Sequence, residues 1–124
     1  MHDATECGVW GGLFEVARAC GKGMTIDKEK IIVQDAVKKV CDLFSIDPYS
    51  SISEGTLIVT CRPHKAQELV RRLQDKGILV STVGEIVDAR HGMRVFEDGK
   101  AGELTHPEVD PFWSAFGKAA SEGR

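Results

Sequence analysis

The sequence has 124 residues and a formal net charge of −3 at neutral pH. This length fits one domain with a modest hydrophobic core. The acidic balance, with no face rich in Lys and Arg, gives no reason to expect binding to nucleic acid. No apolar stretch approaches the roughly 18 residues that a membrane-spanning helix needs, and the polar start Met1–Asp3 lacks the plan of a signal peptide. We therefore expect a cytoplasmic protein without a membrane segment.

The four cysteines lie far apart, at positions 7, 20, 41 and 61. A zinc ribbon or a redox dithiol needs two thiolates close in sequence, and the sequence has no C-x-x-C pair. Cys20, Cys41 and Cys61 fall at apolar positions of expected elements, which favours small buried hydrophobic side chains. We expect no metal site built from these residues.

The first helix is predicted from about Glu6 to Cys20, with Thr5 as its N-cap and Gly21 as its stop signal. Each glycine inside a helix costs about 1 kcal/mol relative to alanine. The first two turns of this helix nevertheless contain three of them: Gly8, Gly11 and Gly12. Either another part of the backbone packs closely against this end of the helix, or a ligand does.

The remaining elements alternate between extended and helical patterns. Helices are predicted at about 35–44, 63–76 and 110–120, and extended segments at 24–27, 31–33, 56–61, 78–87 and 93–96, with a hairpin turn at 97–100. The second helix is expected to bury its apolar positions, which are Val37, Val40, Cys41 and Phe44. This order predicts an α/β (α+β) fold with a mixed β-sheet flanked by helices. We expect a single domain over 1–124, with its core at about 2–100 and a helical tail at about 110–120.

The segment ahead of the first helix carries the most chemical information. It combines a carboxylate (Asp3), a hydroxyl (Thr5) and a bare backbone (Gly8) at the positive end of a helix dipole. Free N–H groups at such an end can bind an anion, and Thr5 could donate to a phosphoryl oxygen. The alternative is that Asp3 and Thr5 only cap the helix.

The stretch His2–Leu13 resembles the opening of the C-terminal domain in the aminoimidazole-ribonucleotide (AIR) synthetase superfamily, whose pattern D-x-[ST]-x-G-G-[LV] leads into a helix. That superfamily includes AIR synthetase, formylglycinamidine synthetase, selenophosphate synthetase, thiamine-monophosphate kinase and a hydrogenase maturation factor. Later landmarks follow in the usual order, at Ala17–Gly21, Gly23–Asp27, Val40–Pro48, Ser53–Leu57 and Gly84–Val87. The resemblance covers about residues 2–100. Within the superfamily, Cys41–Pro48 and Ser53–Gly55 look most similar to the hydrogenase maturation factor.

The resemblance implies an AIR synthase C-terminal-domain-like fold and a place in an ATP-dependent enzyme. Such enzymes use ATP and Mg to activate a substrate atom, and their N-terminal domains dimerise and hold most of the nucleotide and metal ligands. The C-terminal domain covers the cleft. We therefore expect an N-terminal AIR synthase-like domain, in the same gene product or in a separate chain, as the partner, and a homodimer in the full protein. We expect the isolated chain to be inactive, with no catalytic residue assigned and with neither ATP nor Mg tightly bound.

By the same resemblance, the residues expected to face the nucleotide phosphates are His2, Asp3, Thr5 and Gly8. Asp3 and Thr5 would contact phosphate or Mg through water. Glu54 and Gly55 are second-tier candidates, with a purely structural turn as the alternative.

Two positions depart from the family pattern. Cys7 stands where the pattern has the first glycine of a Gly-Gly pair, and a side chain would obstruct a site that needs positive φ. Cys7 is either a tolerated substitution or a thiol activated by the helix N-terminus. The maturation factor carries its carbamoyl group on a cysteine at its extreme C-terminus, whereas this sequence ends Ser121–Arg124, so carbamoyl dehydration is not expected.

A second hypothesis is a stand-alone, non-catalytic module with the same fold that binds a ligand or a partner. Its binding surface would be the apolar stripe of the last helix, formed by Phe112, Trp113 and Phe116.

Overall fold

A computed structural model describes the chain over residues 1–123, and Arg124 lies outside the described residues. The helices are Gly8–Cys20 (α1), Asp35–Phe44 (α2), Pro63–Gln74 (α3) and Pro111–Glu122 (α4), with short 3-10 turns at Lys28–Lys30 (η1) and Ala89–His91 (η2). The strands are His2–Ala4 (β1), Gly23–Asp27 (β2), Thr56–Ile58 (β3), Gly84–Val87 (β4), Met93–Glu97 (β5) and Lys100–Glu103 (β6). The expected α/β class is confirmed.

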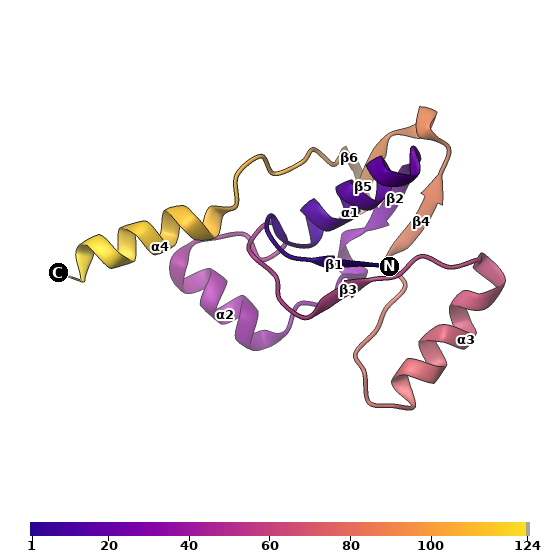
Figure 1. Ribbon diagram of the computed structural model, residues 1–124, viewed down its shortest axis with the longest axis horizontal. Coiled ribbons are helices and arrows are strands. Elements are labelled where there is room, and N and C mark those ends of the chain that lie inside the picture. Colours follow the sequence, from indigo (N-terminus) through magenta and orange to yellow (C-terminus); the bar gives the residue numbers. More distant parts are fainter. Residues whose placement is uncertain (124) are drawn as a thin grey trace.

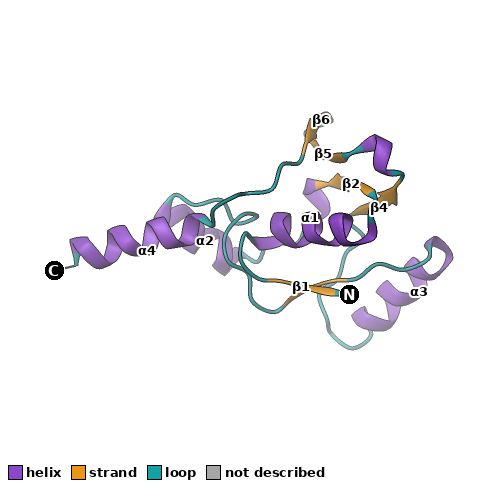
Figure 2. Ribbon diagram, turned by 45° about the horizontal axis from the view of Figure 1, so that its top comes forward, coloured by secondary structure: helices purple, strands orange, loops and turns teal. Residues whose placement is uncertain are grey.

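The strands form two separate sheets on opposite sides of α1 (Figure 2). The larger sheet has the order β4-β2-β5-β6, in which β2 is parallel to β5 and antiparallel to β4. The smaller is an antiparallel ribbon of β1 and β3, with His2 opposite Ile58 and Ala4 opposite Thr56. A two-stranded ribbon is marginally stable in water, so its packing against α1 is what holds it.

The hydrophobic core lies between α1 and the larger sheet. Glycine and alanine positions let α1 lie close to both sheets, while its larger apolar side chains fill the space toward the larger sheet. The core side chains, all less than a tenth exposed, are Trp10, Leu13, Ala17, Met24, Ile26 and Leu104. Leu104 comes from the segment that follows β6, so the chain beyond the sheet is tied to the core at this residue.

The other three helices lie at the periphery, with α3 set apart on one side and α4 extending away with the C-terminal end (Figure 1). The predicted bounds of α2 are confirmed, but its expected burial is wrong for three positions out of the four. Only Cys41 is buried, whereas Val37, Val40 and Phe44 are between 45% and 54% exposed. The pattern is amphipathic, yet most of this face of the helix is exposed and only the part around Cys41 is covered.

Several boundaries differ from the prediction because they depend on contacts distant in sequence. The ribbon strand β1 was not expected, and 31–33 does not form a strand. The segments expected at 56–61 and 78–87 pair only over Thr56–Ile58 and Gly84–Val87.

The side chains of Cys20 and Cys61 are exposed, which corrects the expectation that they are buried. In the described chain, no helix has the length and apolar character needed to cross a membrane.

Candidate functional site

The loop ahead of α1, residues Thr5–Gly8, uses its backbone polar groups within the chain. Cys7, and not Thr5, is the N-cap, with φ 59° and ψ 15° in the left-handed region and no side-chain capping bond. Its N–H donates to the carboxylate of Asp110 at 2.8 Å. The N–H of Trp10 donates to the carbonyl of Tyr49 at 3.1 Å. These N–H groups, which the sequence led us to expect free for an anion, are therefore bonded to other parts of the same chain.

The glycines at the start of α1 are explained by close approach of the chain itself. Gly8 has φ +60°, and a Cβ there would lie 2.5 Å from the carbonyl oxygen of Tyr49 and 2.6 Å from that of Ser51. A Cβ at Gly12 would lie 2.8 Å from Cδ1 of Ile58, in the ribbon. Close packing of the chain against itself, by backbone carbonyls at Gly8 and by a side chain of the ribbon at Gly12, accounts for these two positions.

Of the four residues expected to face a nucleotide, two have exposed side chains. Asp3 and Thr5 are exposed on β1 and just after it. His2 is partly buried, and its Nε2 lies 2.6 Å from the carboxylate of Glu15 on α1. Gly8 is buried beneath the loop carbonyls and does not reach the surface. The accessible rim therefore consists of Asp3 and Thr5, with His2 at its edge.

The second-tier residues lie at the same corner of the molecule. Glu54 and Gly55 are exposed in the turn that enters β3, and the N–H of Ser53 donates to the carbonyl of Thr5 at 2.9 Å. Gly55 has φ +81°, a conformation that glycine adopts without steric cost. This geometry gives Gly55 a structural role in the turn and places Glu54 beside the rim.

The contact that covers the start of α1 comes from the C-terminal part of the chain and was not predicted. Asp110 caps α4 by accepting from the N–H of Phe112 at 2.9 Å, and the same carboxylate reaches Cys7. The thiol of Cys7 donates to the carbonyl of Pro107 at 2.8 Å. The sequence does carry the capping signal, because an aspartate before a proline at a helix start is a common N-cap. Its second partner, 103 residues away, could not be found from sequence.

The environment of Cys7 argues against an activated thiol. Burial is the main cause that raises the pKa of this thiol above its usual value of 9.0, and the negative charge of Asp110 adds to it. A helix N-terminus lowers a thiol pKa, whereas burial raises it, and burial is the larger effect at Cys7. Burial and the raised pKa favour the tolerated substitution, with Cys7 held in the left-handed region.

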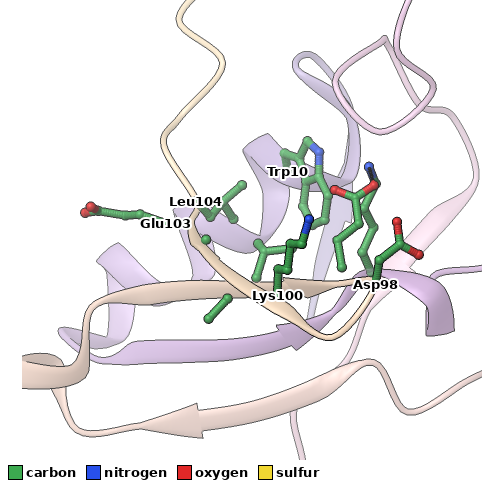
Figure 3. Close-up of a pocket in the computed structure, with 10 residues that line it drawn as sticks. Trp10, Asp98, Lys100, Glu103 and Leu104 are labelled. Carbon is green, nitrogen blue, oxygen red and sulfur yellow. Dashed lines mark hydrogen bonds and ion pairs between the residues drawn. The ribbon is translucent and has the colours of Figure 1, made fainter.

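An open cavity of about 420 Å³ lies between Trp10 and the β5–β6 hairpin. Figure 3 shows Lys100 pointing toward the Trp10 ring and Glu103 pointing away from it. At its margin the ammonium of Lys28 pairs with Glu97. None of the predicted site residues lines this cavity.

The fold and the loop before α1 define the class of the chain. The family described as "AIR synthase related protein, C-terminal domain" matches residues 1–96, and the chain belongs to this family. Among its relatives is carbamoyl dehydratase HypE of Escherichia coli (strain K12), which is 31% identical over 97 residues, 77% of this chain and 29% of that protein. HypE of Azotobacter vinelandii is 30% identical over 93 residues, 73% of this chain and 27% of that protein.

The solved structures agree with this assignment. The crystal structure of E. coli HypE, described as a hydrogenase maturation protein, matches with a TM-score of 0.75 and 31% identity, over 88% of this chain and 35% of that chain. The expected resemblance to the hydrogenase maturation factor is thus confirmed. The chain spans about a third of the length of the relatives it matches.

Proposed function

We propose that this chain is the C-terminal, cleft-covering domain of an ATP-dependent protein of the HypE kind. The observation that carries the proposal is that the family matches residues 1–96 as a C-terminal domain, while the chain spans only 29% of the E. coli relative. The remaining part is an N-terminal AIR synthase-like domain, in the same gene product or as a separate chain, which binds ATP and Mg. The full protein is a cytoplasmic homodimer in this proposal.

The outer face of the β1–β3 ribbon is the surface we assign to the N-terminal domain. Side chains alternate along a strand, and Ala4 and Ile58 point toward Gly12 of α1. Asp3 and Leu57, which lie opposite each other, therefore point away from α1. Leu57 is 58% exposed, an apolar side chain with no cover from the described chain. A face with one carboxylate beside apolar side chains suits a domain interface next to a polar cleft.

The rim residues fit a supporting role toward Mg-ATP. Among residues 1–123, no three side chains of His, Cys, Asp or Glu gather into a potential metal site. Asp3 alone would hold Mg through water, and the Thr5 hydroxyl would donate to a phosphoryl oxygen. His2 and Glu54 would border the same cleft, and Gly55 would shape the turn beside it. Mg supplies charge neutralisation on the phosphates when it is bound.

Calorimetric titration with Mg-ATP tests the proposal. The candidate N-terminal domain, from the same gene product or from a separate chain, is expressed separately. We expect no measurable Mg-ATP binding by the chain alone, and binding by the two parts together that is tighter than by the N-terminal domain alone. Tight binding of Mg-ATP to the isolated chain would contradict the proposal.

Single substitutions test which side chains contact the nucleotide and which contact the N-terminal domain. Asp3→Asn and Thr5→Val are expected to weaken nucleotide binding by the two-part complex without changing its assembly, because each removes one polar contact. Leu57→Lys is expected to weaken assembly itself. Asp88→Asn, an exposed aspartate at the start of η2, is the control and should change neither. A chain that binds a different partner through Trp113 and needs no N-terminal domain would instead support the stand-alone module.

A further inference from the structure

Residues 105–110 form a strap that crosses the start of α1 and leads into α4. The residue before it, Leu104, is buried in the core and fixes its first end. In the middle the ring of His106 meets the ring of Phe14 edge-on, with centroids 5.3 Å apart. At the other end Asp110 bonds to the N–H of Cys7. The strap lies beyond residue 96, where the match to the family ends.

One buried side chain anchors the whole C-terminal region. Within residues 105–123, only Asp110 is buried, at 3% exposed. Two neighbouring apolar side chains contribute little to the stability of this region, because Val109 is 72% exposed and Trp113 is 51% exposed. The buried contacts that close the strap are therefore the polar ones around Cys7 and Asp110, with the ring contact between His106 and Phe14 beside them.

Such a segment opens more easily than the core unfolds. Local opening exposes little apolar surface, so its free energy lies below that of global unfolding. Losing one charge-assisted hydrogen bond in a buried site shifts the opening equilibrium by at least about tenfold. The structure contains that bond between Asp110 and Cys7, with a second contact between the thiol of Cys7 and the carbonyl of Pro107.

We propose that the strap is a latch that opens as a unit, with Asp110 as its closing contact, and that its closed form shields Cys7. Opening frees both the N–H and the thiol of Cys7 and uncovers the side of the α1 start that faces the strap. The latch thereby controls access of the N-terminal domain to Cys7 and this side of the helix start, next to the rim, which is exposed in the closed form as well. This last step rests on the proposed function, whereas the opening itself is a property of this chain alone.

Thiol labelling of the full chain, followed at each cysteine by mass spectrometry, tests the latch without any partner. Cys20 and Cys61 are exposed and label at once, while Cys7 and Cys41 are buried. Asp110→Ala is expected to speed the labelling of Cys7 at least about tenfold and to leave Cys41 unchanged. Asp110→Asn, which keeps the size and loses the charge, should give a smaller increase. Asp88→Asn should give none.

Two results overturn the latch. If Cys7 and Cys41 accelerate by the same factor, the variant destabilises the whole domain; if Cys7 does not accelerate in either variant, Asp110 is not the closing contact. Should Asp110→Ala fail to fold, the wild-type chain is labelled in low urea. A latch predicts that the labelling of Cys7 depends on urea less steeply than global unfolding does, and an equal slope overturns it. Because no nucleotide or partner takes part, failure here leaves the proposed function standing, and the reverse is also true.

Discussion

Trp10 and Tyr49 are joined by two contacts, one between backbones and one between rings. The N–H of Trp10 donates to the carbonyl of Tyr49 at 3.1 Å, and the two rings stack with centroids 5.4 Å apart and planes at 26°. The ammonium of Lys28 lies 4.8 Å from the centroid of the Tyr49 ring. The loop between α2 and β3 is thereby fixed to the start of α1, and this attachment closes the helix end from one side.

Removing the Tyr49 ring should destabilise the domain while preserving the backbone bond. We expect Tyr49→Ala to lower the free energy of unfolding by about 2 kcal/mol, through lost apolar burial and lost ring stacking. Tyr49→Phe keeps the stack and should cost less than about 0.5 kcal/mol. Urea unfolding followed by circular dichroism measures both. The control is Trp113→Ala, which removes a ring that is 51% exposed; if it costs as much as Tyr49→Ala, the assignment of the stack as a stabilising contact is incorrect.

Gly8→Ala should be among the most damaging single substitutions in this chain. The new Cβ would meet two backbone carbonyls at 2.5 and 2.6 Å, and φ is +60°. A left-handed conformation costs an ordinary residue about 1–2 kcal/mol, and backbone overlap adds to this, so we expect a loss of at least about 3 kcal/mol or failure to fold. Gly117→Ala is the matched control, because it lies inside α4 with nothing within 4 Å of the new Cβ. It should leave the urea midpoint unchanged or raise it.

The sequence predicts local features of this chain well and long-range features poorly. The bounds of α2 and the stop of α1 at Gly21 follow from capping and breaking residues within a few positions of the helix ends. Strand β1 depends on pairing with β3, which lies more than fifty positions away in the sequence. No local sequence pattern predicts this pairing. The same holds at the candidate site: Asp3 and Thr5 lie at the surface, but the cover over Gly8 is made by Tyr49 and Ser51.

The exposed face of α2 shows why an amphipathic pattern does not by itself identify a packed face. The pattern says that a helix has an apolar side, and only tertiary structure says whether anything covers it. Leu43→Lys should therefore change the free energy of unfolding by less than about 0.5 kcal/mol, because Leu43 is 77% exposed. Cys41→Lys places a charge at a side chain that is 5% exposed and should cost more than about 3 kcal/mol. Equal effects of the two substitutions in urea unfolding would show that α2 packs differently.

The buried thiols predict how stability changes at alkaline pH. Burial is the main cause that raises the pKa of both Cys7 and Cys41 above the usual 9.0, with Asp110 adding to the effect at Cys7 and Asp47 at Cys41. A raised pKa means that the folded chain binds these protons more tightly than the unfolded chain does, so the stabilisation is complete below pH 9 and is lost as the pH rises through the folded-state values. We expect the urea midpoint to fall as the pH rises above 9.

Serine variants separate this effect from the titration of other groups. In Cys7→Ser and Cys41→Ser the titrating proton is absent, so each should flatten the alkaline fall of the midpoint even where it lowers stability at pH 7. Cys20→Ser and Cys61→Ser are the matched controls, because these thiols are exposed and should leave the slope unchanged. An alkaline slope that is the same in all four variants would show that neither buried thiol is held protonated by the fold.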